Sequence, residues 1–223
     1  MTAPLFERSV LRPGLHVSRR ASAPVSKAIL LATGVRTEPA WRLPFMGFDD
    51  YVDSIVGLTH DALFVIDPED GRMKIGDAIG GATGKCVLTP IEVWEDGCRR
   101  DGDRVIVGRP AGASDAQLEL VAAWWIRNVL GRRYDSVAIA RLGMKALCGD
   151  WLSGKVGLYS HFYCTEGVAD ADAKGGLCDP YWPNENPTPG TTTRRYRSGR
   201  LRIEPGALTE AGRRFRADVF RMA

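Results

Sequence analysis

Short apolar runs bounded by turn residues dominate the first half of the chain and predict a small sheet. The segment 59–66 leads from a histidine into a short apolar run, which is typical of a buried strand. The turn cluster Asp-Pro-Glu-Asp-Gly at 67–71 predicts a hairpin whose second strand covers 72–79. Residues 86–90 restart an extended segment, and 104–110 predict another strand, ended by a proline.

A helical repeat of apolar positions is clearest at residues 114–130. Ser114 can cap this helix, Gln117 stands at the capping-box position, and the apolar residues from Leu118 to Val129 fall on one stripe. Further helical patterns are found at 23–33, 137–147, 164–174 and 208–222, with a short helical turn at 90–94. The remaining segments are expected to be irregular or edge-like (1–20), extended (159–163), loop (179–193) and a last strand (201–203).

These elements together predict an α+β fold, in which a small antiparallel sheet or partial barrel packs against helices on one side. We expect one domain over residues 1–205. Residues 35–57 are rich in Pro, Trp, Phe and Gly, and we interpret them as an inserted loop or lid. Residues 206–223 are expected to form a basic C-terminal helix or tail.

The composition is that of an ordinary globular protein, with 223 residues, 44% apolar and 26% charged. No run of 18 or more apolar residues is present, so we expect no membrane span. The first thirty residues lack an apolar core followed by a cleavage site. We therefore expect no signal peptide, and a location in the cytoplasm or in a virion. Five cysteines without a Cys-x-x-Cys spacing predict neither a disulfide framework nor a metal site, and no cofactor is expected.

Positive charge gathers at the C-terminal end of the chain. Residues 190–223 hold nine arginines and three acidic residues, a net charge of +6 that leaves −3 on the rest. Such a segment could bind an anionic surface or an assembly partner, but we favour an arginine-rich face that docks on the acidic remainder. Aromatic residues are not interleaved with the arginines in a stacking pattern, which argues against nucleic acid as the partner.

His60 and Cys164 are the candidate reactive pair. Cys164 stands where an extended stretch gives way to a helical pattern, and a helix start favours the thiolate form of a cysteine. An imidazole on a strand edge could take the thiol proton and return it to a leaving group. The rival base is His161, but in an extended segment residues three apart point to opposite faces. His16 is the weakest candidate.

The order of these motifs resembles that of a known family, the circularly permuted NlpC-type papain-like cysteine hydrolases (YiiX-like proteins). In that branch the histidine precedes the cysteine. The matching pieces are Leu-Arg-Pro-Gly (11–14), Ser-Lys-Ala-Ile-Leu-Leu-Ala-Thr-Gly (26–34), Thr-His-Asp-Ala-Leu-Phe-Val (59–65), Ile-Gly-Asp-Ala-Ile (75–79), Val-Leu-Thr-Pro-Ile-Glu-Val-Trp (87–94), Gly-Arg-Arg-Tyr-Asp (131–135) and Tyr-Cys-Thr-Glu (163–166). They cover roughly residues 11–205 with gaps.

The resemblance implies a catalytic triad of Cys164, His60 and Asp77. Asp77 stands where the family usually has a glutamate that orients the histidine, and its side chain is one methylene shorter. Strand alternation also puts Asp77 on an apolar face, where a carboxylate needs a partner such as an imidazole. The family's aspartate after the Pro-Gly turn is replaced by Leu15. The other cysteines are interpreted as structural: Cys86, Cys98, Cys148 and Cys178.

The leading functional hypothesis is a cysteine peptidase or amidase that attacks an amide carbonyl. The resemblance implies cell-wall peptide (peptidoglycan) as its substrate, and a phage-tail or otherwise delivered component would suit a chain without a signal peptide. An alternative is a lipid-directed acyltransferase or esterase, whose acyl chain the 35–57 segment would cover. A third hypothesis is a structural assembly protein that keeps the fold and docks through its arginine-rich end.

Overall fold

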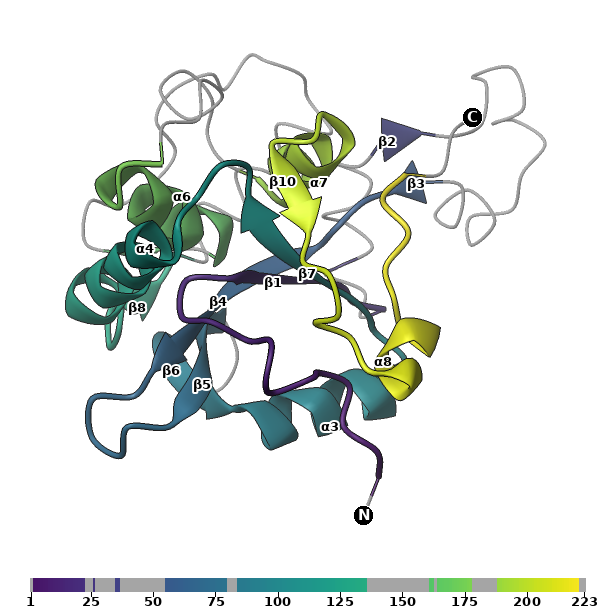
Figure 1. Cartoon of the computed structure of the whole chain (residues 1–223), viewed down its shortest axis with the longest axis horizontal. Helices are drawn as coiled ribbons and strands as arrows, with labels where there is room; N and C mark the ends of the chain where they lie inside the picture. The colour runs from purple at the N-terminus through teal and green to yellow at the C-terminus, as the bar shows by residue number, and fades with distance from the viewer. Residues whose placement is uncertain are drawn as a thin grey trace.

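The hairpin expected at 60–79 lies in the middle of the main sheet, whose eight strands run in the order β10-β7-β1-β4-β5-β6-β8-β9 (Figure 1). The structure is a computed structural model that describes residues 2–22, 26, 35–36, 55–79, 84–135, 161–162, 164–177 and 188–220. All neighbouring strands pair antiparallel except β8 and β9, which are parallel. The strands of this sheet are β1 (His16–Arg20), β4 (His60–Ile66), β5 (Met73–Ile79), β6 (Lys85–Pro90), β7 (Arg104–Pro110), β8 (Arg133–Tyr134), β9 (His161–Phe162) and β10 (Leu201–Ile203).

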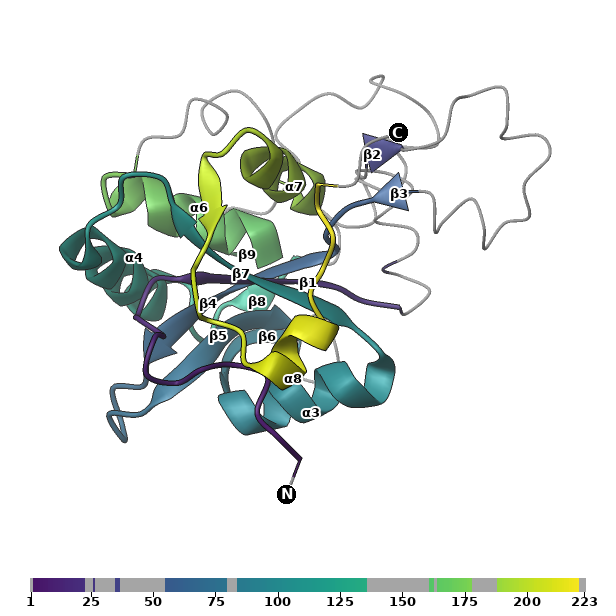
Figure 2. The same ribbon diagram turned by 45° about the vertical axis from the view of Figure 1, so that its right-hand side comes forward.

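Helices cover both faces of the sheet, so the expectation that they lie on one side was wrong. Within the described residues they are α3 (Ile91–Asp101), α4 (Asp115–Asn128), α6 (Cys164–Lys174), α7 (Pro189–Arg197) and α8 (Glu210–Arg214). The alternation in β4 explains the two-sided arrangement, because Phe64 packs with Trp94 of α3 and Leu63 packs with Trp125 of α4. Figure 2 shows α3 on one side of the sheet and α4 with α6 on the other.

The core on the α3 face also includes Phe6 from the N-terminal segment. The rings of Phe6 and Phe64 meet edge to face, with their centroids 5.4 Å apart. On the opposite face Gly76 of β5 lies directly under the ring of Trp125. A Cβ atom at Gly76 would lie 2.7 Å from that ring, so the glycine allows α4 to approach the sheet closely.

Several predicted elements are confirmed with close boundaries. The strand over 104–110 is β7, the strand over 201–203 is β10, and the helix from Cys164 to Lys174 is α6. Ser114 and Gln117 form the expected capping box at the start of α4. The helices predicted at 23–33 and 137–147 lie outside the described residues, apart from Ser26, which is helical. The two ends of the 35–57 segment pair as a separate ribbon of β2 (Val35–Arg36) and β3 (Ile55–Val56), and its middle lies outside the described residues.

The N-terminal segment was predicted to be irregular or edge-like, and this was wrong for its second half. Strand β1 is central, between β4 and β7. Leu15 and Val17 pack into the core on one face, while His16 and Ser18 are buried on the other. The polar residues of β1 are typical of an edge strand, but here they are buried beneath other elements. His16, for example, bonds to Asp172 of α6.

Three helix boundaries also differ from prediction. The turn at 90–94 continues as α3 to Asp101, because Ile91, Trp94 and Cys98 form one buried stripe. The loop predicted at 179–193 gives way to α7, which Thr188 caps. The helix predicted at 208–222 is limited to α8.

The chain leaves α8 early because its backbone bonds to β7 instead of continuing the helix. The amide of Val105 donates to the carbonyl of Phe215, and the amide of Ala217 donates to the carbonyl of Val105, both at 2.7 Å. Leu208 forms a bridge with Phe6 of the N-terminal segment. Ala217 and Val219 are buried, so this C-terminal segment contributes to the core.

Candidate functional site

His60 begins β4 at the edge of the hairpin, with a side chain that is 13% exposed. Its Nε2 is hydrogen-bonded to Oδ1 of Asp77 on β5. The register that pairs Leu63 with Gly76 sets Asp77 opposite Ala62, so His60 and Asp77 are diagonal neighbours on one face of the sheet. This short separation lets an aspartate reach the imidazole without the extra methylene of a glutamate.

Asp77 is fully buried and is held from its other side by α3. Trp94 Nε1 donates a hydrogen bond of 3.2 Å to Asp77 Oδ2, so each carboxylate oxygen has its own donor. The guanidinium of Arg19 lies 5.4 Å from the centre of the Trp94 ring. Burial raises the pKa of Asp77, but His60, Arg19 and Trp94 together lower it below its ordinary value.

Cys164 is the first residue of α6, and it is buried, with 3% exposure. Its position at the helix start agrees with the sequence prediction. Its thiol lies close enough to His60 to contribute to the raised pKa of the imidazole. The structure therefore brings together all three residues that the sequence predicted as a site: Cys164, His60 and Asp77.

The surroundings of His60 favour its charged form. Burial alone lowers the pKa of the imidazole. The Asp77 carboxylate and, after it, Cys164 outweigh this effect and raise the pKa to about 10. The imidazole is therefore protonated at neutral pH, and Asp77 is the main source of this effect.

The other described cysteines differ from Cys164 in their surroundings. Burial raises the pKa of Cys86 to about 12 and that of Cys98 to about 12 as well, which keeps both as neutral thiols. Both pack in the core, as expected for structural cysteines. Cys148 and Cys178 lie outside the described residues.

The two other histidines have different environments. His16 is fully buried, and its Nε2 lies 3.0 Å from Oδ1 of Asp172 on α6. Asp172 also pairs with Arg195 of α7, whose Nη2 is 2.9 Å from Oδ2. His16 is thus part of a buried ionic cluster, which the sequence did not predict. The backbone of His161 lies in β9, and its side chain lies outside the described part of the chain.

Trp94 and Arg19 also escaped the sequence analysis, although both act on the predicted triad. Trp94 closes the segment 87–94 that carries the family resemblance, but nothing in that segment predicts its hydrogen bond to Asp77. Arg19 is paired with His60 across β1 and β4, a neighbour that depends on strand order and register. Local sequence patterns carry no signal for either.

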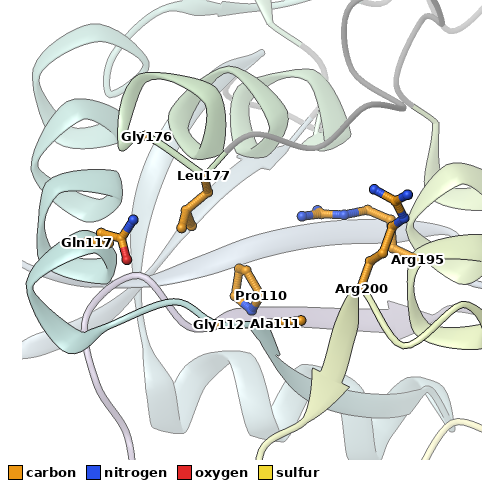
Figure 3. A pocket seen from close by; sticks show the side chains of 8 residues that line it. All are labelled: Pro110, Ala111, Gly112, Gln117, Gly176, Leu177, Arg195 and Arg200. Carbon is orange, nitrogen blue, oxygen red and sulfur yellow. The ribbon is translucent and has the colours of Figure 1, made fainter.

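A cavity of about 250 Å³ lies well away from the triad (Figure 3). Its walls come from the end of β7, the first turn of α4, the end of α6 and the α7–β10 connection. Figure 3 shows Arg195 and Arg200 on one side, with Gln117 and Leu177 on the other. Because Cys164 begins α6 and the cavity lies past its end, the 11 residues of the helix separate them by about 16 Å.

The described residues contain no group of three or more His, Cys, Asp or Glu side chains that could hold a metal ion. None of the helices in this part of the chain has the length and apolar character needed to cross a membrane.

The fold and site define the chain at the level of class: an α+β protein in which a buried helix-start cysteine meets a strand histidine and a buried carboxylate. No protein-family model matches the chain. No curated protein matches it either. Among solved structures it is similar to the metalloprotein YiiX from Escherichia coli O157:H7, with 17% identity and a TM-score of 0.46, covering 89% of this chain and 94% of that one.

Proposed function

We propose that this protein is a thiol hydrolase in which Cys164 is the nucleophile, His60 the acid and base, and Asp77 the group that orients His60. The observation that supports this most directly is the position of His60 between the thiol of Cys164 and the carboxylate of Asp77. A nucleophile, a base and a base-orienting group in contact is the arrangement that acyl transfer requires.

The first half of the reaction transfers an acyl group to sulfur. The reaction begins with the proton of Cys164 held on His60 as an imidazolium, and the thiolate of Cys164 attacks the carbonyl carbon of an amide or ester. The backbone N–H of Cys164, at the start of α6, donates to the developing oxyanion. The tetrahedral intermediate then collapses, the bond to the leaving nitrogen or oxygen breaks, and His60 donates its proton to that leaving group.

The second half restores the enzyme. His60, now neutral, accepts a proton from a water molecule whose oxygen attacks the thioester carbon. Collapse of this second intermediate breaks the carbon–sulfur bond, releases the carboxylic acid and restores the thiolate of Cys164 and the imidazolium of His60 with which the reaction began. Asp77 remains ionised and stabilises the imidazolium, while Trp94 fixes the orientation of the carboxylate.

The substrate class is proposed from the sequence resemblance alone. Peptide amides, with cell-wall peptides first among them, are the substrates that the resemblance implies, and acylated lipids are the alternative. Action on the cell wall as a phage-tail or delivered component belongs to the same proposal.

Alkylation of Cys164 tests whether the site is active. We expect iodoacetamide to modify Cys164 selectively at a pH below the pKa of a free thiol, about 8.5. Cys98 is the internal control, because its raised pKa keeps it unreactive. Peptide mapping by mass spectrometry would measure both rates in one sample. Equal, slow modification of both cysteines would contradict the proposal and favour the structural assembly protein.

A panel of peptidoglycan fragments and acylated lipids, assayed with wild type and Cys164→Ala, would then identify the substrate class. Turnover that Cys164→Ala abolishes supports the hydrolase, and its substrate decides between the peptide and lipid alternatives. Turnover that survives in Cys164→Ala would assign the activity to another group.

A further inference from the structure

Asp61 follows His60 in β4 and is fully buried, yet the proposed reaction does not use it. Strand alternation points the Asp61 side chain to the face opposite His60, the face that α6 covers. There Asp61 Oδ2 accepts two hydrogen bonds of 2.8 Å, one from the hydroxyl of Thr165 and one from the hydroxyl of Thr192. Among the described residues, Asp61 Oδ1 has no hydrogen-bond partner.

A buried carboxylate with one unsatisfied oxygen is costly for the folded state. An apolar residue would be the more stable choice at this position, on the same face as Leu63 and Val65, which pack against α4 and α6. The cost suggests that the carboxylate does something that an apolar side chain could not do.

The partners of Asp61 indicate what this is. Thr165 directly follows Cys164 in the first turn of α6, and Thr192 lies in α7. Asp61 therefore ties the start of the cysteine helix to the strand that carries the histidine. The link runs along the backbone of β4 from His60 to Asp61, then through the hydrogen bond of Asp61 with Thr165 to the neighbouring Cys164.

The same bonds orient the Thr165 hydroxyl. Because its hydrogen points to Asp61, its oxygen presents only lone pairs to Cys164 Sγ, which lies 3.8 Å away. The hydroxyl cannot then donate to a thiolate, so the nearby imidazole of His60 is left as the donor available to the sulfur. Asp61 thus affects both the position of the Cys164 thiol and which group can donate a hydrogen bond to it.

We propose that Asp61 is a positioning residue, which acts through Thr165 to align Cys164 with His60. This inference rests on the proposed function, since it assumes that the pair of Cys164 and His60 reacts. Thr192 steadies the carboxylate from α7 and does not touch the cysteine.

Two matched variants separate alignment from simple stability. Thr165→Val and Thr192→Val each remove one of the two donors to Asp61, so we expect similar losses of stability. Only Thr165→Val should lower the rate of Cys164 alkylation, by about tenfold to a hundredfold, because only Thr165 adjoins the sulfur. Thr165→Ser keeps the hydroxyl and should restore the wild-type rate. Asp61→Asn should behave like Thr165→Val.

The rates are measured from below to above the pKa of a free thiol, at a temperature where circular dichroism shows each variant folded. A wild type whose Cys164 reacts like a free thiol would contradict the proposed function itself. A reactive wild type with an equally reactive Thr165→Val would contradict only the positioning role. Equal losses in Thr165→Val and Thr192→Val, or failure of Thr165→Val to fold, would overturn it in favour of a purely structural role.

Discussion

Asp77 is a buried carboxylate that bonds to His60 through one oxygen and to Trp94 through the other. It is a polar residue on an apolar strand face, and it stands where the resembling family has a longer carboxylate. Its burial is tolerated because His60 and Trp94 each bond to a different oxygen. An asparagine has only one oxygen, so it could satisfy only one of these donors.

Asp77→Asn should therefore lower kcat strongly, by about 10²- to 10⁴-fold, because the imidazole loses both its orientation and its charge partner. Trp94→Phe is the matched control, since it removes one donor but keeps the carboxylate charge, and it should lose much less. Steady-state kinetics on the substrate found in the panel would measure both. An Asp77→Asn variant with nearly full activity would remove Asp77 from the mechanism.

His60 gives a pH dependence whose direction is fixed by its raised pKa. The folded pKa of about 10 lies above the ordinary value of 6.5, so the protonated imidazole stabilises the folded state. This contribution is complete below pH 6.5 and is lost as the pH rises toward about 10. We expect the difference in unfolding free energy between wild type and His60→Ala to shrink over that range, measured by urea denaturation. A difference that grows with pH would contradict the assigned charge state.

At the scale of elements, α6 and α7 are joined to the sheet by buried polar groups as well as by apolar packing. Asp172 of α6 bonds to His16 of β1 and to Arg195 of α7. The burial of Asp172 raises its pKa, but His16 and Arg195 lower it below the ordinary value. Arg195, from the arginine-rich C-terminal end, thus forms an ion pair with Asp172 in the acidic remainder of the chain. The charge distribution predicted docking of this kind.

Asp172→Asn should destabilise the fold by about 3–5 kcal/mol, because it removes one charge of the buried ion pair with Arg195. Asp96→Asn is the control, since Asp96 pairs with Arg99 while remaining 69% exposed, and its loss should cost less than about 1 kcal/mol. Since the pKa of Asp172 is lowered, its contribution is present above about pH 3.9 and is lost as the pH falls further. Chemical denaturation at neutral and acidic pH would measure both effects. A neutral Asp172→Asn variant would show that the cluster contributes no net stability.

The elements that were predicted well carry their own local signals. The capping box of Ser114 and the apolar stripe behind it are sufficient to define α4, and the turn at 67–71 is sufficient for the hairpin. Strand β1 and α7 were missed because their polar residues have partners far along the chain, such as Asp172 for His16. That Cys164, His60 and Asp77 lie close together could be predicted because an ordered set of motifs carries the three residues, and their catalytic roles remain a prediction. Asp61, Arg19 and Trp94 could not, because strand order and helix docking bring them to the site.

For the whole molecule, the two ends of the chain close the fold together. Thr209 donates from its backbone amide to the carbonyl of Leu5 at 3.0 Å, and Leu208 bridges to Phe6. The sequence placed a domain boundary at 205, which remains a prediction. Because residues beyond 205 are buried against the rest of the chain, removing them tests this boundary.

Deletion of residues 206–223 should unfold the protein or lower its Tm sharply, because Leu208, Ala217 and Val219 are buried against the rest. Leu208→Ala is a milder version and should cost about 2–5 kcal/mol. Phe220→Ala is the control, since that side chain is 48% exposed. Thermal denaturation would compare the three. A truncated chain as stable as the full one would support the boundary at 205.

The central place of β1 has a consequence for how the chain reaches its native state. Its hydrogen-bonding partners on one side come from β7, so His16 meets Gly108 only after more than a third of the polypeptide has left the ribosome. Such distant pairing gives a high contact order, and we expect slow folding. Until β7 arrives, the nascent protein exposes an unpaired strand on which chaperones or neighbouring chains can act.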